Sequence, residues 1–217
     1  MRRPHPRQTP IVAGQSTLLV IDMQQAFCLP GLGIFEHPAA KWTAERREAY
    51  FRALGPALAN AGRLARGFRA SGQEVLYTVI QSLTADGRER SLDHKLSDLH
   101  IPKDSWGGEV MPEIAPQGDE MVLPKSASGV FNSTVIDYVL RNLGIEHLAI
   151  CGVFTDQCVE SAVRDASDKG YYTTLVSDAC AGQTPELHDN SCTAMAAYGR
   201  VRTTAELLDE LKQFKAA

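Results

Sequence analysis

Apolar residues occur along this chain in two patterns, short nearly continuous runs and longer stretches with helical spacing. The first run covers residues 16–22 and ends in an acidic side chain, Asp22. Such a run is typical of a central parallel strand, because both faces of that strand are covered. Residues 42–70 are rich in alanine and arginine, which predicts a long helix with a break near Gly55 and Pro56.

Strand and helix patterns alternate through the rest of the chain. Further strands are expected at 74–80, 120–123, 147–153, 172–177 and 201–203, and further helices at 132–143, 156–170, 185–198 and 205–214. This alternation predicts an α/β fold, a doubly wound six-stranded parallel sheet with helices on both faces. We expect one domain over residues 16–217, preceded by a flexible arm over residues 1–15.

Composition narrows the possible partners and the cellular setting. The formal charge of -4 and the 22% of charged residues give no reason to expect nucleic acid or a membrane as a partner. Five cysteines without a Cys-x-x-Cys pair argue against a disulfide framework or a structural zinc site. The basic N-terminal residues 1–10 lack the apolar core of a signal peptide, so a cytoplasmic location is expected.

The segment 148–170 runs from a buried strand through a tight turn into a helix. Thr155 is expected to cap that helix, which would make Cys158 its third residue. A sulfur there lies beside free backbone N–H groups and the positive end of the helix dipole, a setting that stabilises a thiolate. The alternative is a small buried hydrophobe beneath a helix, the usual role of a free cysteine.

Three chemically useful residues follow predicted strands. Asp22 ends the first strand, Lys125 lies just past the third, and Cys158 lies just past the fourth. Ligands of such sheets bind at the carboxyl ends of the strands, so an acid, a cation and a thiol are expected at one edge. There the acid could take the thiol proton and the cation could stabilise both charged forms. Singly, the acid could instead cap a helix and the lysine could be a solvated loop residue.

Three motifs resemble those of the isochorismatase-like cysteine hydrolases. They are residues 18–24 (Leu-Leu-Val-Ile-Asp-Met-Gln), residues 123–125 (Leu-Pro-Lys) and residues 152–159 (Gly-Val-Phe-Thr-Asp-Gln-Cys-Val). The family includes nicotinamidases, N-carbamoylsarcosine amidase, and biuret and ureidoacrylate hydrolases. The resemblance extends from Ser16 to Leu211.

This resemblance implies a catalytic triad of Asp22, Lys125 and Cys158 acting through an acyl-enzyme. It implies an oxyanion hole formed by the backbone amides of Phe154 and Cys158, with a cis peptide bond between Val153 and Phe154. It also suggests a homodimer or homotetramer.

Family members that cleave the vinyl ether of isochorismate typically lack the cysteine, so Cys158 favours hydrolysis of a C–N bond. The expected substrate is a small amide, carbamoyl compound or ureide. Nicotinamidases carry a metal site with an Asp-x-His pair after the second strand, whereas residues 78–88 here contain no histidine. No metal and no other cofactor is therefore expected. The alternatives are a vinyl ether hydrolase, a phosphorelay receiver domain, and a non-catalytic binding or scaffold domain.

Residues 81–108 form a long polar stretch without a clear hydrophobic periodicity. Long irregular loops inside a compact domain often contribute to a functional site. The residues expected to bind substrate come from this loop and from two other turns: Phe27, Gln81, Arg88, Trp106, Phe131 and Asn132. Arg88 could pair with a substrate carboxylate or carbonyl, or be a solvated loop residue. Trp106 could form a wall of the pocket, or anchor the loop or a subunit contact.

Overall fold

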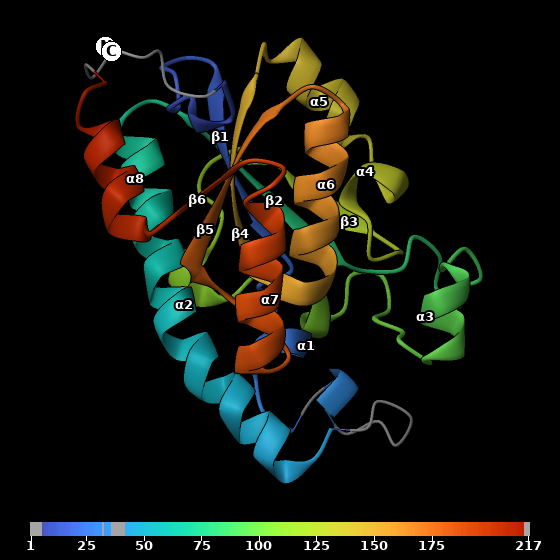
Figure 1. Ribbon diagram of the computed structural model, residues 1–217. Coiled ribbons are helices and arrows are strands. Elements are labelled where there is room, and N and C mark those ends of the chain that lie inside the picture. The colour runs from blue at the N-terminus through green and yellow to red at the C-terminus, as the bar shows by residue number, and fades with distance from the viewer. Residues whose placement is uncertain (1–5, 32, 36–41, 215–217) are drawn as a thin grey trace.

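The computed structural model describes residues 6–31, 33–35 and 42–214 (Figure 1). In this part of the chain, six strands form one sheet in which every neighbouring pair is parallel, with the order β3-β2-β1-β4-β5-β6. The strands are β1 (Ser16–Ile21), β2 (Glu74–Ile80), β3 (Val122–Lys125), β4 (His147–Val153), β5 (Tyr172–Ala181) and β6 (Arg200–Arg202). The predicted parallel α/β sheet is confirmed.

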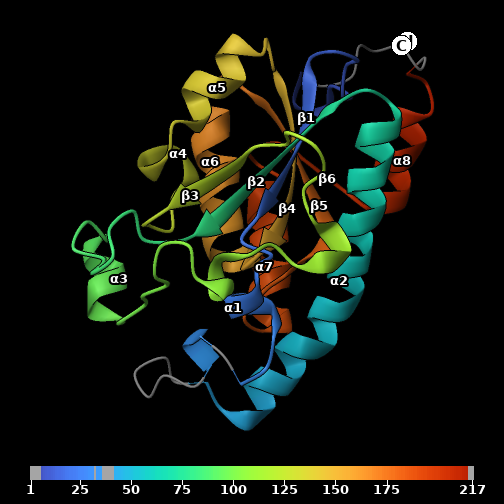
Figure 2. The ribbon, with the colours of Figure 1, turned by 180° about the vertical axis from the view of Figure 1, so that it is seen from behind.

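Helices cover both faces of the sheet. Figures 1 and 2 show α2 (Ala44–Ala70) and α8 (Thr204–Leu211) on one side, with α5 (Ile136–Asn142) and α6 (Glu160–Asp168) on the other. α7 (Pro185–Met195) packs against α6. Three short helices lie in the connections, namely α1 (Gln25–Cys28), α3 (Leu92–Leu96) and α4 (Val130–Ser133).

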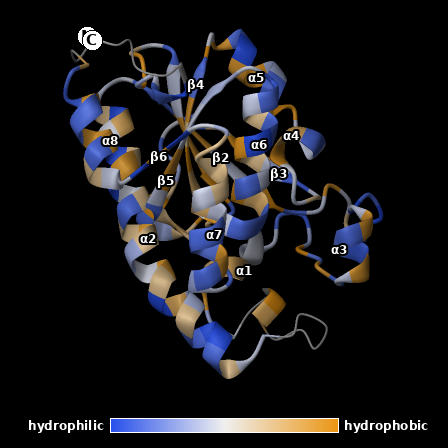
Figure 3. Ribbon diagram, viewed as in Figure 1, coloured by the Kyte–Doolittle hydropathy of each residue, from blue (hydrophilic) through white to orange (hydrophobic). Residues whose placement is uncertain are grey.

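The core lies where the helices meet the strands. Every residue of β1 and β4 is buried, which explains why their sequences are almost continuous apolar runs. Figure 3 shows hydrophobic colouring along the central strands and mixed colouring on the surrounding helices. Among the described helices, none is both long enough and apolar enough to span a membrane.

Helix α2 corrects the expectation of a break near Gly55 and Pro56. It continues without interruption from Ala44 to Ala70 and contains the proline. A proline inside a helix leaves the carbonyl four residues earlier, here that of Arg52, without its helical donor. Arg52, Gly55 and Pro56 are all exposed, so water can satisfy that carbonyl and the helix tolerates the proline.

Gly152 allows β4 to approach β1 closely just before the functional edge. It has φ of 134°, and a Cβ atom built there would lie 2.1 Å from the carbonyl oxygen of Ile21. The pairing of β4 with β5 also shifts register between Ile150 and Gly152. Only glycine fits this position, because any side chain would collide with the neighbouring backbone.

The segment before β1 was expected to be a flexible arm over residues 1–15. Within its described part, Ile11 is buried in the core, and its N–H donates to Glu210 Oε2 at 3.2 Å. The N–H of Val12 donates to Ser16 Oγ at 2.8 Å. Ile11 therefore packs on the domain, because its apolar side chain gains burial, whereas the side chain of Val12 is exposed.

Candidate active site

Three side chains meet at the carboxyl edge of the sheet. Asp22 follows β1 directly, Lys125 is the last residue of β3, and Cys158 lies in a π-helical turn, Thr155–Val159, between β4 and α6. Lys125 Nζ lies 2.8 Å from Asp22 Oδ2 and 3.4 Å from Cys158 Sγ. The acid, cation and thiol that the sequence placed at one edge therefore lie in contact, where the strand order reverses between β1 and β4.

The backbone and a neighbouring strand hold the Asp22 carboxylate. Asp22 has φ of 55°, a left-handed conformation that a short polar side chain tolerates. Its N–H donates to the carbonyl of Thr78 at 3.0 Å, and Thr78 Oγ1 donates to Asp22 Oδ1 at 3.1 Å. Burial raises the pKa of Asp22 above its ordinary value, and the ammonium of Lys125 opposes that shift.

Lys125 is fully buried and makes several charge-assisted contacts. Besides the Asp22 carboxylate, its ammonium donates to the carbonyls of Ala127 at 3.0 Å and Ser128 at 3.3 Å. Burial alone would lower the pKa of Lys125, but attraction to Asp22 and Cys158 outweighs it and the pKa is raised. The side chain is therefore a fixed cation beside the thiol, not a solvated loop lysine.

The resting form of Cys158 differs from the expected thiolate. Burial raises the pKa of Cys158 to about 12, although Lys125 acts in the opposite direction. The nearby negative charge of Asp22 raises the pKa further. The resting group is thus a thiol, because removing the sulfur from water outweighs the nearby positive charge of Lys125.

The turn that carries Cys158 also differs from the expected capped helix. Phe154 occupies the cap position, and the turn is π-helical before α6 begins at Glu160. The hydroxyl of Thr155, expected to be the cap, lies 2.8 Å from Nδ1 of His188 on α7. The expected cis peptide bond between Val153 and Phe154 is confirmed.

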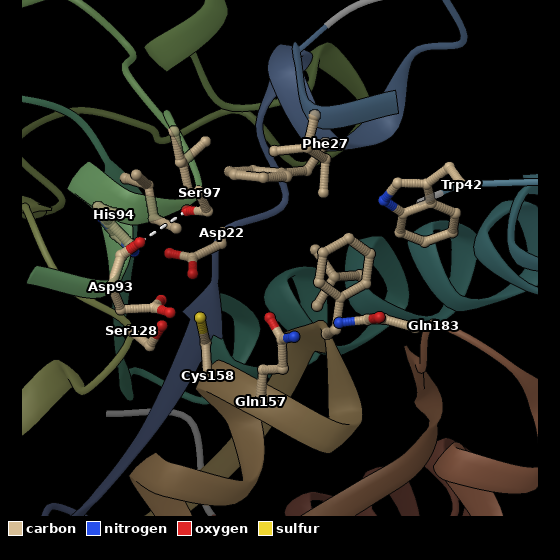
Figure 4. Close-up of a pocket in the computed structure, with 15 residues that line it drawn as sticks. Asp22, Phe27, Trp42, Asp93, His94, Ser97, Ser128, Gln157, Cys158 and Gln183 are labelled. Carbon is tan, nitrogen blue, oxygen red and sulfur yellow. Dashed lines mark hydrogen bonds between the residues drawn. The ribbon is translucent and has the colours of Figure 1, made fainter. Parts of the chain in front are cut away.

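A cavity of about 190 Å³ opens beside the sulfur of Cys158. Phe27, Trp42 and Phe154 form an aromatic wall, with ring centroids of Phe27 and Phe154 6.0 Å apart and those of Trp42 and Phe154 5.7 Å apart. Figure 4 shows Asp93, His94 and Ser97 on the other side of the cavity, with the sulfur between the two sides. The cavity therefore has one aromatic wall and one polar wall.

Of the residues expected to bind substrate, Phe27 lines this cavity. The other five are absent from the described lining: Gln81, Arg88, Trp106, Phe131 and Asn132. Arg88 is exposed and pairs with Asp86 at 3.0 Å, and Trp106 is 51% exposed.

The remaining three residues have other surroundings. The N–H of Gln81 donates to the carbonyl of Lys125 at 3.0 Å. The Phe131 ring packs 6.0 Å from Tyr171, and Asn132 is exposed on α4. These five residues therefore lie outside the described lining, although the 81–108 stretch expected to supply the pocket does contribute Asp93 and His94.

Sequence reasoning missed most of the polar lining, namely Asp93, His94, Ser97, Ser128, Gln157 and Gln183. One signal was present for α3, since Ser91 is a typical N-cap residue. Its Oγ accepts from the N–H of His94 at 3.2 Å.

Gln24 ends the first motif, residues 18–24, and the sequence alone assigned it no role. It donates to the carbonyls of Ile80 and Gly107, each at 2.9 Å, and accepts from the N–H of Ile80 at 2.6 Å. Gln24 therefore ties the end of β2 to the loop that follows it.

No group of three or more potential metal ligands occurs within the described part of the chain. The expectation that no metal takes part in the reaction remains a prediction.

Comparisons with known proteins agree with this architecture. The sequence model of the isochorismatase domain matches residues 16–206. A cysteine hydrolase from Pseudomonas syringae pv. phaseolicola 1448A superposes with a TM-score of 0.81 at 23% identity, covering 99% of this chain and 100% of the other.

Two further solved structures are similar over most of the chain. An isochorismatase family protein from Desulfovibrio vulgaris subsp. vulgaris str. Hildenborough has a TM-score of 0.74 at 27% identity, covering 92% of this chain and 99% of that one. N-carbamoylsarcosine amidase from Thermoplasma acidophilum has a TM-score of 0.67 at 25% identity, covering 88% and 96%. The domain match spans most of the sequence and includes all three site residues, and the chain therefore belongs to the isochorismatase family.

Proposed function

We propose that this protein hydrolyses the C–N bond of a small amide, carbamoyl compound or ureide through a covalent acyl-enzyme. The observation that carries the proposal is the contact among a buried carboxylate, a buried ammonium and a thiol at the floor of a cavity. Asp22, Lys125 and Cys158 act as one unit. Similarity to an N-carbamoylsarcosine amidase supports a C–N bond as the target.

Acylation begins with transfer of the Cys158 proton to Asp22, whose raised pKa makes it a stronger base. The sulfur attacks the substrate carbonyl carbon, and a C–S bond forms as the carbonyl oxygen becomes an oxyanion. When the oxyanion collapses, the C–N bond breaks and Asp22 returns its proton to the departing nitrogen. Lys125 remains protonated and balances the negative charge that moves between Asp22 and the sulfur.

Deacylation uses the same groups in reverse. Asp22 takes a proton from water as that water attacks the acyl carbon, and the C–S bond then breaks. The proton returns to the sulfur as the acid product leaves. The N–H groups of Phe154 and Cys158 serve as oxyanion donors in both halves, each worth about 3 kcal/mol in the transition state.

An ammonia-release screen over small amides, carbamoyl compounds and ureides tests the proposal, with Cys158→Ala as the critical variant. We expect turnover of at least one compound, abolished in Cys158→Ala with the circular dichroism spectrum unchanged. Cys192→Ala is the matched control, because Cys192 is partly exposed and lies outside the described cavity lining. Full activity of Cys158→Ala would refute the mechanism. Hydrolysis of isochorismate alone would instead establish the vinyl ether reaction.

A further inference from the structure

The charges around the cavity are unevenly distributed. Its described lining contains two acidic side chains, Asp22 and Asp93, and no lysine or arginine. Lys125, 2.8 Å away, balances Asp22, whereas Asp93 has no ion-pair partner within the described ranges. Figure 4 shows the Asp93 carboxylate next to Ser128, on one side of the Cys158 sulfur. The polar wall therefore presents to a ligand a negative charge that has no ion-pair partner in the described structure, on a side chain that is also exposed to solvent.

The adjacent imidazole does not offset that charge. His94 lines the same wall and is only 1% exposed. Burial and the nearby Lys125 lower the pKa of His94 to about 4, so the ring is neutral near pH 7. Its Nδ1 has no hydrogen-bond partner within the described structure. That nitrogen is itself buried, so a ligand N–H does not reach it in this structure, and the ring adds no charge to the wall.

The polar wall is held in place next to the reacting groups. Ser91 caps α3, and its N–H donates to the carbonyl of Ser126 at 2.9 Å, one residue after Lys125. The carbonyl of His94 accepts from the N–H of Leu99 at 2.9 Å. The start of α3 is therefore joined to the segment that follows Lys125, and a local backbone contact closes its other end.

Among the described residues, Arg46 is a cation that lies near the opposite wall. The Arg46 guanidinium stacks 4.6 Å from the centroid of Trp42 and donates to the side chain of Gln183. Trp42 and Gln183 line the cavity, and Arg46 lies behind them, outside the described lining. It does not offer a carboxylate a direct partner inside the cavity.

We propose that Asp93 is a specificity-determining residue that selects substrates with a distal amine, ammonium or amide N–H over substrates with a distal carboxylate. The inference rests on the proposed function, since it concerns the substrate of the same site. The acyl group packs against the aromatic wall while its distal N–H groups reach Asp93. A distal carboxylate would meet the Asp93 charge with no lysine or arginine in the described lining to balance it.

Charged thiol reagents test the selectivity without requiring turnover. Two methanethiosulfonates of similar size, one with an ammonium and one with a sulfonate, react with a cysteine thiolate and release methanesulfinate. Peptide mass spectrometry measures the rate at Cys158 separately from the more accessible Cys192. We expect the ratio of cationic to anionic rates to fall about tenfold in Asp93→Asn, because one negative charge is lost near both probes.

Asp86→Asn is the matched control, since it removes the same charge from the same loop at a position that lies outside the described cavity lining and pairs with Arg88. Its ratio should stay within about twofold of the wild type, because solvent and salt screen a charge that does not face the cavity. An Asp93→Asn ratio equal to that of the control would overturn the proposal.

Turnover separates this proposal from the proposed function. Butanamide, 4-aminobutanamide and succinamate carry neutral, cationic and anionic tails on a similar chain. We expect Asp93→Asn to lower kcat/KM for 4-aminobutanamide and raise it for succinamate, with little change for butanamide. If the amides are hydrolysed but Asp93→Asn changes kcat/KM equally for all three, the proposed role of Asp93 is refuted and the hydrolase proposal stands. Failure of the enzyme on every amide, with the probe ratio still shifted in Asp93→Asn, would refute only the hydrolase proposal.

Discussion

Replacement of Lys125 by methionine tests both the stability and the chemistry of the site. Methionine has a similar length but no charge, so Lys125→Met leaves the Asp22 carboxylate buried without its cation. At an effective dielectric constant of about 20, opposite charges 2.8 Å apart attract by about 6 kcal/mol. Part of that attraction offsets the desolvation of both groups, and removing one partner of a buried pair costs about 3–5 kcal/mol.

The free energy of unfolding, measured by urea titration at pH 7, should therefore fall by about 3–5 kcal/mol in Lys125→Met. The double variant Asp22→Asn/Lys125→Met removes both charges and is expected to be more stable than the single variant. The alkylation profile of Cys158 should move to higher pH in Lys125→Met, because Lys125 lowers the pKa of that thiol. A stability loss under about 1 kcal/mol, or an unchanged alkylation profile, would refute the assigned role of Lys125.

The remaining predictions concern the backbone, the buried imidazole and metal ions. Gly152→Ala should prevent folding or lower the free energy of unfolding by more than about 3 kcal/mol, because its Cβ would overlap the Ile21 carbonyl. Gly170→Ala, at φ of 93° with open space, should lose only about 1 kcal/mol. The pKa of His94 is 6.5 unfolded and about 4 folded, so its contribution to stability is present above pH 6.5 and declines toward pH 4. In the wild type, the free energy of unfolding measured by urea titration should fall between pH 7 and pH 5. That fall should be smaller by about 1–2 kcal/mol in His94→Asn, and an equal fall in the two proteins would contradict a buried neutral ring. Exhaustive chelation should leave the hydrolysis rate unchanged, and activity lost with chelator and restored by zinc would show that a metal takes part.

The sequence was sufficient to bring Asp22, Lys125 and Cys158 together. Each lies at or just after a strand whose apolar run is set by burial, and parallel strands end at the same edge of their sheet. Errors of two residues in a strand boundary did not matter here. β3 ends at Lys125 instead of before it, and the side chain still reaches Asp22.

The cavity walls were not predictable in the same way, because their positions depend on contacts between distant segments. Threonine is a common helix-capping residue, but the hydroxyl of Thr155 forms its contact with His188, 33 residues later in the chain. α3 is only five residues long, too short for a periodic pattern, so neither Asp93 nor His94 could be assigned to the cavity. Arg88 and Trp106 have suitable chemistry for a pocket, but the path of their loop turns them outward.

The strand order divides the active site between two halves of the chain. β1, β2 and β3 are neighbours in the sheet and are complete by Lys125, so the first half contains both members of the buried ion pair. The chain then returns to the centre of the sheet, where β4 pairs with the other edge of β1. Cys158 lies in the turn that follows β4. Cys158 thus contacts Asp22 and Lys125 only when the early half, with β1–β3, has packed against the late half, with β4–β6, so the thiol lacks these partners in any species in which the halves have not joined. During refolding, recovery of catalysis would therefore report the packing of the two halves against each other. Secondary structure can return in each half before that step.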